Sequence, residues 1–269
     1  MTNVLYSIIL GVVQGVAEWL PISSKTQVLI VSQYLFAFPT AVAFALGLFM
    51  EVGSLGSASV YFRREIFSLL KDRKLLAYLF VVTVVTGVVG VPLFVLSERL
   101  LQRSYNIGIP MIVLGAFLIF DAIYIRFSRR SPKTGGLKDM SLKHYVAIGL
   151  AQGLAALPGV SRSGMTTSTM LFMGVEPKDA FRLSYLAYIP ASLGAFGATL
   201  VFSRDEVTTA ITTIDSGGIA IAIVTAGLVG LATISLLLRF AKKNNIYVVT
   251  LVLGILALAV GLLGALGSF

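Results

Sequence analysis

The sequence predicts an all-α integral membrane protein with six transmembrane helices and two re-entrant broken-helix hairpins, arranged as an inverted-topology repeat. Three observations support this fold class: the composition, a set of long apolar segments, and a motif that occurs twice. Of the 269 residues, 57% are hydrophobic and 12% are charged, and the mean hydropathy is +0.93. A soluble domain usually carries about 25% charged residues. The composition therefore excludes a soluble enzyme, a disordered chain and a collagen-like fibre.

The six spans follow from the length of the apolar segments. A transmembrane helix needs about 20 largely apolar residues. Four stretches without charge meet this requirement, at 75–97, 183–203, 216–238 and 244–269. Two further spans, 40–62 and 104–125, hold one acid each, Glu51 and Asp121. Asp121 lies near one end of its span, where an ion pair or a side chain that reaches to the membrane interface is favoured.

Two shorter apolar segments, 2–17 and 145–160, predict the broken hairpins. The first is followed by Glu18 and a polar cluster, and the second by Ser161 and Arg162. Both are typical of helices that enter the membrane, break and return to the same side. Irregular backbone of this kind is tolerated only where it is buried in protein or lines a wet cavity.

The two broken segments repeat one motif. The letters GVVQGVA at 11–17 align with GLAQGLA at 149–155, an offset of 138 residues. The G-x-x-x-G spacing in both copies favours close packing against another helix. The repeats extend over about 1–128 and 142–269 of a single membrane domain and are joined by a basic cytoplasmic loop at 126–143. Each repeat holds one hairpin and three spans, so the second starts on the opposite side of the membrane. Interrupted segments in corresponding halves indicate a site near the bilayer midplane.

The basic residues test this topology. Sixteen of the 21 Lys and Arg residues lie in 63–74, 126–143, 178–182 and 239–243, on one side of the predicted membrane. Three others, Arg99, Arg103 and Arg204, lie on the other side. Cytoplasmic loops carry an excess of Lys and Arg, so both termini are expected outside the cytoplasm. The net charge of +9 is explained by this orientation, and no nucleic-acid partner is expected.

Arg162 is the most informative residue of the second break. A guanidinium inside a membrane costs about 2.5–3.5 kcal/mol on insertion scales, so it is rarely there without an anionic partner. Its planar fork suits phosphate, and Ser161, Ser163 and the Gly164 amide supply further donors. A helix that begins near 164–165 would add its N-terminal amides. The alternative is a plain helix break in which Arg162 pairs with a buried acid.

Glu18 is the only acid of the first hairpin, and Gln14 lies one helical turn before it on the same face. Glu18 can bind a divalent cation or act as a general base toward water. The alternative is a structural ion pair with Lys25 or Arg162. Glu51 lies in the middle of its span, so it either pairs with a cation or faces the site.

Other polar residues of the breaks leave two alternatives each. Gln152 matches Gln14 in the repeat, and each is either a polar ligand or a hydrogen-bond partner between packed helices. The hydroxyls of Ser23, Ser24 and Thr166 can donate to phosphate or bond back to helix carbonyls. A histidine metal cluster is excluded because the chain has one histidine, and thiolate sites are excluded because it has no cysteine.

These motifs resemble those of the undecaprenyl-diphosphatase family, the membrane proteins associated with bacitracin resistance. Residues 14–24 read QGVAEWLPISS, which is similar to the family's Gln/Glu-x-x-x-Glu motif and its Pro-x-Ser-Ser continuation. Residues 158–166 read PGVSRSGMT, and residues 61–65 read YFRRE. With the hydropathy pattern, the resemblance extends over essentially the whole chain.

The resemblance implies hydrolysis of a polyprenyl diphosphate to the monophosphate and phosphate, aided by a divalent cation such as Mg²⁺ or Ca²⁺. It also implies a site that opens to the outer leaflet of the plasma membrane. Gln14 and Glu18 would bind the metal or activate water, and Arg162 would clamp the charge. The diphosphate would contact Ser24, Ser161, Ser163 and Thr166. Our further candidates are Ser23, Lys25, Gln27, Gly164 and Gln152 for the substrate, and Glu51 for the metal.

The chain departs from the family pattern at Gln27. Family members usually continue Ser-Ser-x-Gly-His, whereas this chain reads SSKTQ at 23–27, so a glutamine stands at the position of a histidine. Glutamine cannot take a proton at neutral pH. Either Glu18 supplies the base alone, Glu51 assists it, or this chain has lost hydrolysis. Lys25 adds a cation near the phosphates.

The sequence therefore predicts a membrane phosphatase that recycles a lipid carrier. Phosphoryl transfer to water needs positioning and charge neutralisation, which an arginine, helix N-termini, a metal and one carboxylate can provide. One alternative is a transporter that moves a polyprenyl-phosphate carrier without hydrolysis, because inverted repeats with broken hairpins suit alternating access. A catalytically inactive lipid binder is another. The expected partners are a polyprenyl diphosphate and membrane lipids, and the sequence also permits a homodimer.

Overall fold

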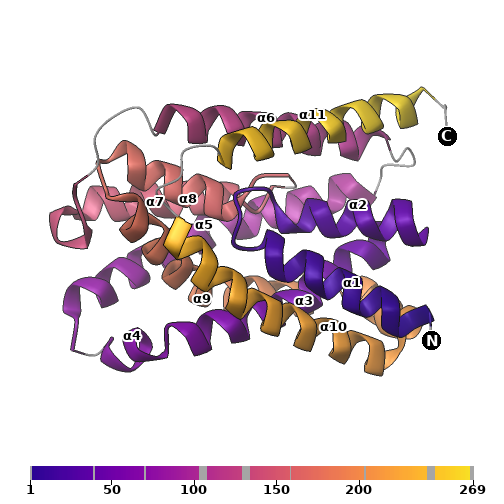
Figure 1. The fold of residues 1–269 in the computed structure, drawn as a ribbon, viewed down its shortest axis with the longest axis horizontal. Coiled ribbons are helices and arrows are strands. Elements are labelled where there is room, and N and C mark those ends of the chain that lie inside the picture. Colours follow the sequence, from indigo (N-terminus) through magenta and orange to yellow (C-terminus); the bar gives the residue numbers. More distant parts are fainter. Residues whose placement is uncertain are drawn as a thin grey trace. The chain divides into compact units, whose positions relative to one another are not determined.

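The structure is a computed structural model that describes residues 2–38, 40–69, 71–102, 108–128, 134–157, 159–202, 204–240 and 246–266. Its regular secondary structure in these ranges is helical, apart from one isolated bridge between Gly135 and Val175 (Figure 1). The helices are α1 (Thr2–Ala17), α2 (Ser24–Phe36), α3 (Thr40–Tyr61), α4 (Arg63–Ser68), α5 (Arg73–Gln102), α6 (Gly108–Ser128), the short 3₁₀ helix η1 (Leu137–Asp139), α7 (Leu142–Leu154), α8 (Arg162–Phe172), α9 (Pro177–Phe202), α10 (Arg204–Phe240) and α11 (Ile246–Ala265).

Five helices in the described ranges are long and apolar enough to cross a membrane. They are Arg73–Ser97, Met111–Ser128, Pro177–Phe202, Asp215–Arg239 and Tyr247–Ala265, and they match the five predicted spans other than 40–62. The all-helical, multi-span class is therefore confirmed. The predicted span 40–62 is the helix α3, which is not among the five. Parts of the predictions lie outside the described residues: 103–107 and 129–133, 158, 203, 241–245 and 267–269.

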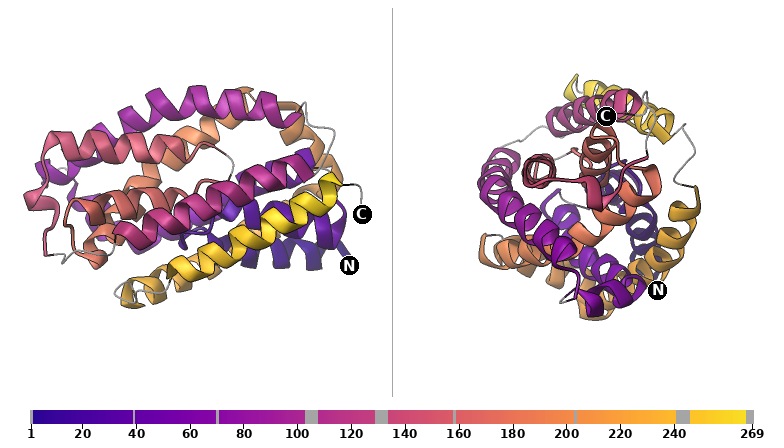
Figure 2. Two further views of the ribbon diagram at one scale, coloured as in Figure 1. Left: turned by 90° about the horizontal axis from the view of Figure 1, so that it is seen from above. Right: turned by 90° about the vertical axis from the view of Figure 1, so that its left-hand side faces the viewer.

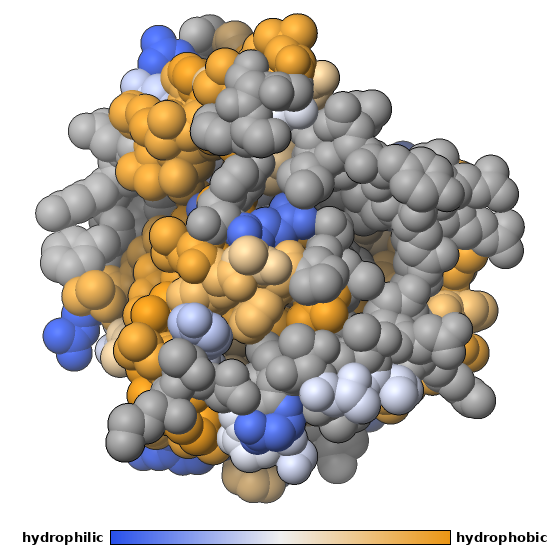
Figure 3. Space-filling model, turned by 90° about the vertical axis from the view of Figure 1, so that its right-hand side faces the viewer, coloured by the Kyte–Doolittle hydropathy of each residue, from blue (hydrophilic) through white to orange (hydrophobic). Residues whose placement is uncertain are grey.

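One face of α5 is apolar and exposed. Its members recur every three or four residues, and each is between 39% and 71% exposed: Leu76, Phe80, Val84, Val88 and Val91. Apolar side chains are also exposed on the face of the molecule in Figure 3. Soluble proteins rarely expose contiguous apolar surface of this kind. Helices whose outward face is apolar are suited to lipid, because their backbone hydrogen bonds are made internally.

The chain divides into two compact units that interleave in sequence. The first consists of Met1–Leu20, Ser24–Arg73 and Tyr185–Arg239, and the second of Pro21–Ser23, Lys74–Ser184 and Phe240–Phe269. Neither unit is a continuous half of the chain. The short segment Pro21–Ser23 belongs to the second unit, although the first unit precedes and follows it in the sequence.

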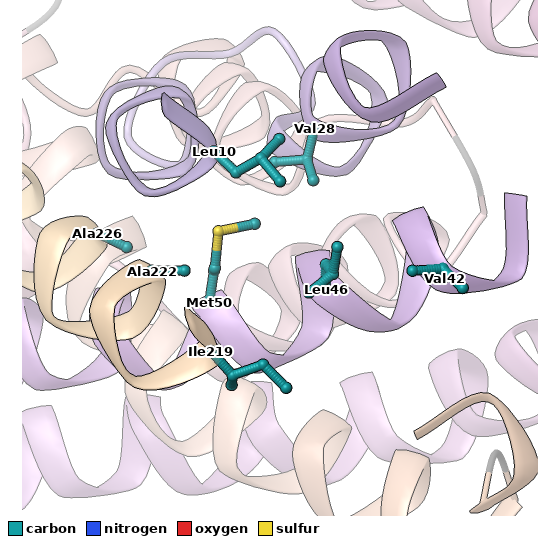
Figure 4. Close-up of a cluster of buried hydrophobic side chains, with 8 residues drawn as sticks. All are labelled: Leu10, Val28, Val42, Leu46, Met50, Ile219, Ala222 and Ala226. Atoms are coloured by element: carbon teal, nitrogen blue, oxygen red, sulfur yellow. The ribbon is translucent and has the colours of Figure 1, made fainter. Parts of the chain in front are cut away.

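The core of the first unit lies between α1, α2, α3 and α10 (Figure 4). Its buried side chains are Leu10, Val28, Val42, Leu46, Met50, Ile219, Ala222 and Ala226. Helix α1 packs directly on the backbone of α10. A Cβ atom added to Gly11 would lie 2.7 Å from the carbonyl oxygen of Ala222, and one added to Gly15 would lie 2.8 Å from that of Ala226. Only glycine permits this approach, as the G-x-x-x-G spacing predicts.

The second unit makes a similar contact with α7 and α5. A Cβ atom added to Gly149 would lie 3.0 Å from the carbonyl oxygen of Val82, and one added to Gly153 would lie 2.8 Å from the Cβ atom of Val89. Both glycine pairs thus pack closely on a long apolar helix of their own unit.

Helices α6 and α11, both in the second unit, run side by side in opposite directions (Figures 1 and 2). A Cβ atom added to Gly115 would lie 2.6 Å from the amide nitrogen of Leu258, and one added to Gly254 would lie 2.9 Å from that of Ile119. Gly254 follows Gly115 by 139 residues, and Leu258 follows Ile119 by the same number. The contact is therefore reciprocal: the glycine of each helix packs against the residue four positions after the glycine of the other helix.

Candidate active site

The first break separates α1 from α2. Helix α1 ends at Ala17 and α2 begins at Ser24, so the helix interruption predicted after residue 17 is present. Ser23 has a φ of 55°, in the left-handed region that non-glycine residues seldom adopt. The chain of the break is buried rather than looped into solvent, and Trp19 within it is 0% exposed.

A buried polar cluster in the first unit holds the carboxylate of Glu18. The Ser24 hydroxyl donates to Glu18 Oε2 at 2.6 Å, and the Gln14 amide nitrogen donates to the same oxygen at 2.9 Å. The Gln14 amide nitrogen also lies 3.4 Å from the hydroxyl oxygen of Ser54 on α3. Gln14 is 0% and Glu18 7% exposed. The predicted pair of Gln14 and Glu18 therefore shares one site with Ser24, at the point where the helix breaks.

Glu51 forms an ion pair with Lys25 in the same unit. The Lys25 ammonium nitrogen lies 3.3 Å from Glu51 Oε1, and the side chains are 31% and 8% exposed. Of the two alternatives for Glu51, pairing with a cation is the one observed. Gln27 lies one turn after Ser24 on α2 and is partly buried.

Two tyrosines of α9 that the sequence-based prediction missed hold the backbone of this site. The Tyr185 hydroxyl donates to the carbonyl of Trp19 at 2.7 Å, and the Tyr188 hydroxyl donates to the carbonyl of Glu51 at 3.2 Å. Both rings pack edge-on against the Trp19 ring. Ser54 was also missed, although its place one turn after Glu51 on α3 is a signal that helical periodicity provides.

The Glu18 cluster fits a hard divalent cation through its oxygen atoms. Gln14 Oε1 is buried and has no hydrogen-bond partner among the described residues, and the Glu18 carboxylate lies beside the same side chain. Mg²⁺ and Ca²⁺ bind carboxylate and amide oxygens. Among the described residues, no three or more His, Cys, Asp or Glu side chains lie close enough together to hold a metal ion. A cation here would therefore take few ligands from the protein. Mg²⁺ commonly binds in this way, with substrate phosphates and water completing its shell.

The second break separates α7, which ends at Leu154, from α8, which begins at Arg162. Ser161 is the N-cap of α8, and its hydroxyl oxygen accepts from the amide of Gly164 at 3.2 Å. The predicted start near 164–165 is therefore too late. A serine at this position satisfies an otherwise unpaired amide, so the helix extends back to include Arg162, which is partly buried.

Asp121 corrects a second prediction. It is buried and makes no ion pair among the described residues. It is 0% exposed, and its Oδ2 accepts from the backbone amide of Ser161 at 2.6 Å. The amide that Asp121 binds belongs to the residue just before Arg162.

The remaining predicted residues of the second unit surround the start of α8. Ser163 Oγ lies 3.3 Å from Ser161 Oγ, and the Thr166 hydroxyl lies 2.6 Å from that of Ser184 on α9. A Cβ atom added to Gly164 would lie 3.2 Å from the Cβ atom of Pro21, so segment 21–23 packs against this helix start. The Pro21 carbonyl also accepts from Thr250 of α11 at 2.9 Å.

Gln152 makes the interhelical hydrogen bond that was one of its two alternatives. Its amide nitrogen donates to the hydroxyl of Thr86 on α5 at 3.1 Å. Gln152 is 3% exposed, and its Oε1 has no hydrogen-bond partner among the described residues. Its amide donor is thus used for packing α7 on α5, whereas its acceptor is not.

Gly159 determines the shape of the second break, and we expect Gly159→Ala to destabilise the protein strongly. Its φ is +89°, and an added Cβ atom would lie 2.8 Å from Leu114 Cα. Gly174 provides the matched control, since it has a similar φ of +85° but nothing within 4 Å. Alanine at a positive φ costs about 1 kcal/mol or more. Thermal unfolding in detergent should give a clearly larger loss for Gly159→Ala than for Gly174→Ala. Equal losses would contradict the steric argument.

The structure thus groups the predicted residues into two sets. The first unit holds Gln14, Glu18, Ser24, Lys25, Gln27 and Glu51, and the second unit holds Ser23, Gln152, Ser161, Arg162, Ser163, Gly164 and Thr166. One set supplies a hydrogen-bonded carboxylate and the other supplies an arginine beside a capped helix start. A carboxylate, an arginine and helix amides are among the groups that phosphoryl transfer can use.

Several known proteins are similar to this chain over almost their entire length. The family model described as "Bacitracin resistance protein BacA" matches residues 7–260. A protein of Sulfurisphaera tokodaii named "Undecaprenyl-diphosphatase" is 57% identical over 261 residues, which cover 97% of this chain and 98% of that protein. Proteins of the same name from Saccharolobus islandicus and Pyrobaculum islandicum are 52% and 42% identical, over 99% and 96% of this chain and 100% and 96% of theirs.

The fold and the two sets of residues define a multi-pass helical membrane protein with charged, buried helix breaks. Its apolar helices and the two interrupted segments account for nearly the whole chain. The chain belongs to the BacA bacitracin-resistance protein family.

Proposed function

We propose that this protein is a membrane phosphatase that hydrolyses an undecaprenyl-type diphosphate to the monophosphate and inorganic phosphate. The observation that carries the proposal is the buried carboxylate of Glu18, held by Gln14 and Ser24 in a helix break of a chain whose full-length relatives are named undecaprenyl-diphosphatases. These names favour hydrolysis over the transport of a lipid carrier.

Glu18 is the general base in this proposal. It takes a proton from a water molecule, whose oxygen attacks the terminal phosphorus. The bond from that phosphorus to the bridging oxygen breaks, and the polyprenyl monophosphate leaves. The hydrogen bonds from Gln14 and Ser24 fix the orientation of the carboxylate, which is the main requirement for a base that must meet its substrate in one geometry. Lys25 is held by Glu51 and contributes a positive charge near the base.

Arg162 neutralises the negative charge of the diphosphate in the same proposal. Its place at the first turn of α8 lets the positive end of the helix dipole act with it on an anion. Thr166 and Ser161 support this helix start through their hydrogen bonds to Arg162 O and Gly164 N. Partly buried charges act more strongly on phosphate than exposed ones, because water screens them less.

Gln14 and Glu18 would hold the divalent cation. The cation supplies additional charge neutralisation for the phosphate oxygens when it is bound. Glu51 is a less suitable ligand in the form described, since its carboxylate is engaged by Lys25.

We also propose six spans, with α3 as the sixth, and an inverted repeat with the site open to the outer leaflet and both termini outside. The order of helices supports the repeat: α1, α2, α3, α5 and α6 are followed by α7, α8, α9, α10 and α11 of similar lengths. The start of α8 follows that of α2 by 138 residues, and the start of α11 follows that of α6 by the same number. The similar glycine contacts of α1 and α7 support it further.

The experiment that tests the function is a phosphate-release assay on the purified protein with a C15 or longer prenyl diphosphate. We expect release with Mg²⁺ or Ca²⁺ and none with EDTA, and no release from the corresponding prenyl monophosphate, which lacks the anhydride bond. Absence of release with both metals would contradict the proposal. Movement of labelled lipid across proteoliposomes in that case would favour the transporter.

We expect Gln27→His to change the rate of phosphate release by less than about threefold. The reason is that the Glu18 carboxylate is already buried and oriented by Gln14 and Ser24, so a second general base adds little. The comparison is made between pH 5 and 8, where a histidine of ordinary pKa, about 6.5, changes its charge. A gain of tenfold or more would mean that this chain lacks a group that the reaction uses.

A further inference from the structure

The second break rests on one face of α6, which belongs to the same unit. Leu114, Phe117 and Asp121 recur at helical spacing and so lie on one side of this helix. A Cβ atom added to Gly159 would lie 2.9 Å from the carbonyl oxygen of Leu114 and 3.1 Å from the Cβ atom of Phe117. Two residues later, the amide of Ser161 binds Asp121. The face of α6 therefore contacts the break first by packing and then by a hydrogen bond.

Asp121 is the polar member of this face. Its Oδ2 accepts from the Ser161 amide at 2.6 Å, and its Oδ1 is buried without a hydrogen-bond partner among the described residues. A buried backbone amide that is left without an acceptor costs its full desolvation penalty. A buried carboxylate is expensive, and packing alone would be served by an apolar residue like Leu114. The carboxyl group of Asp121 thus serves as the acceptor for a backbone amide of the break.

Ser161 passes this constraint on to Arg162. The Ser161 amide donates to Asp121, and the Ser161 hydroxyl oxygen accepts from the Gly164 amide. Ser161 therefore links α6 to the first turn of α8. Arg162 is the next residue and the first of the helix. We infer that Asp121 is a positioning residue: by holding the Ser161 amide it sets where α8 begins and so where Arg162 is presented. The inference rests on the proposed function for its effect on catalysis, but not for its effect on the break.

The kinetic test compares Asp121→Ala with Asp121→Asn. The asparagine retains a carbonyl oxygen that accepts from the Ser161 amide, whereas alanine has no acceptor. We expect kcat/KM for the prenyl diphosphate to fall about tenfold or more in Asp121→Ala and to stay within about threefold in Asp121→Asn, with most of the alanine loss in KM. An equal loss in both variants would overturn the inference, because it would assign the effect to the charge or a proton rather than the hydrogen bond.

A second measurement does not depend on activity. The chain has no cysteine, so Val160→Cys places a single thiol in the break beside Ser161, at a position that is 7% exposed. We expect maleimide to label it about fivefold faster or more in the Asp121→Ala background, and at the unchanged rate with Asp121→Asn. Tyr124→Phe is the matched control, since it removes another hydrogen bond from α6 to α8, that of Tyr124 with Thr169 at 3.0 Å. It keeps the ring, which packs against the buried cluster that includes Val160.

These results separate the two proposals. Unchanged labelling in Asp121→Ala overturns the inference even if the enzyme is active. Faster labelling in Asp121→Ala, together with no phosphate release from the protein in which Asp121 is intact, supports the role of Asp121 in the break and overturns the proposed function. Where Asp121→Ala does not survive purification, Asp121→Leu fills the volume without an acceptor, and the same increase in labelling is expected.

Discussion

Arg162→Ala is expected to lower kcat/KM for a prenyl diphosphate by about a thousandfold or more without unfolding the protein. Arginines that neutralise a transferring phosphoryl group contribute about 10³–10⁵ to the rate. Ser161 rather than Arg162 caps α8, and the side chain of Arg162 is partly exposed, so the helix start does not require the guanidinium. The measurements are phosphate release under saturating metal and the midpoint of thermal unfolding in detergent.

Arg162→Lys and Arg63→Ala complete this experiment. Lysine keeps the charge but not the planar fork that binds two phosphate oxygens, so we expect an intermediate rate. Arg63 is exposed at the start of α4 and donates to the carbonyl of Val60, and its removal should leave the rate unchanged. If Arg162→Ala keeps more than a tenth of the activity, the arginine does not act on the diphosphate.

Glu18→Gln is expected to lower kcat by about 10²–10⁴-fold, the usual contribution of a general base. Glutamine has nearly the shape of glutamate, and its carbonyl oxygen can still accept from Ser24. The variant therefore removes the charge and the basicity while preserving much of the cluster with Gln14. Single-turnover phosphate release measures the chemical step directly.

Two further variants identify the base. Ser24→Ala removes the 2.6 Å hydrogen bond to Glu18 but leaves the carboxylate, so we expect a smaller loss than in Glu18→Gln. Glu51→Gln breaks the ion pair with Lys25 and should also cost less. A rate within threefold of the original in Glu18→Gln, together with a large loss in Glu51→Gln, would transfer the role of base to Glu51.

The spans and the positions of the breaks are predictable from sequence because they depend on local properties. Apolar length alone places α5, α9 and α11, and the predicted break after residue 17 coincides with the end of α1. The predicted span at 216–238 also begins beside the non-helical Asp215, where α10 is kinked. In each case the signal lies within one segment of the chain.

The partners of the site residues are not predictable in this way. Asp121 binds an amide 40 residues away, and Tyr185 binds a carbonyl 166 residues away. Backbone amides and carbonyls are present at every residue, so nothing in the sequence distinguishes the ones that are bound. The start of α8 was predicted too late for a related reason. A serine next to an arginine is equally suited to bind phosphate and to cap a helix, and only the structure shows that the Ser161 hydroxyl caps α8.

The reciprocal meeting of Gly115 with Leu258 and Gly254 with Ile119 has a consequence for the origin of the chain. A surface that is complementary to its own copy can join two identical molecules about a twofold axis. A five-helix polypeptide carrying one such glycine would form this contact with a second copy of itself. Fusion of two such genes would produce the repeat that we propose, with its glycines already in place.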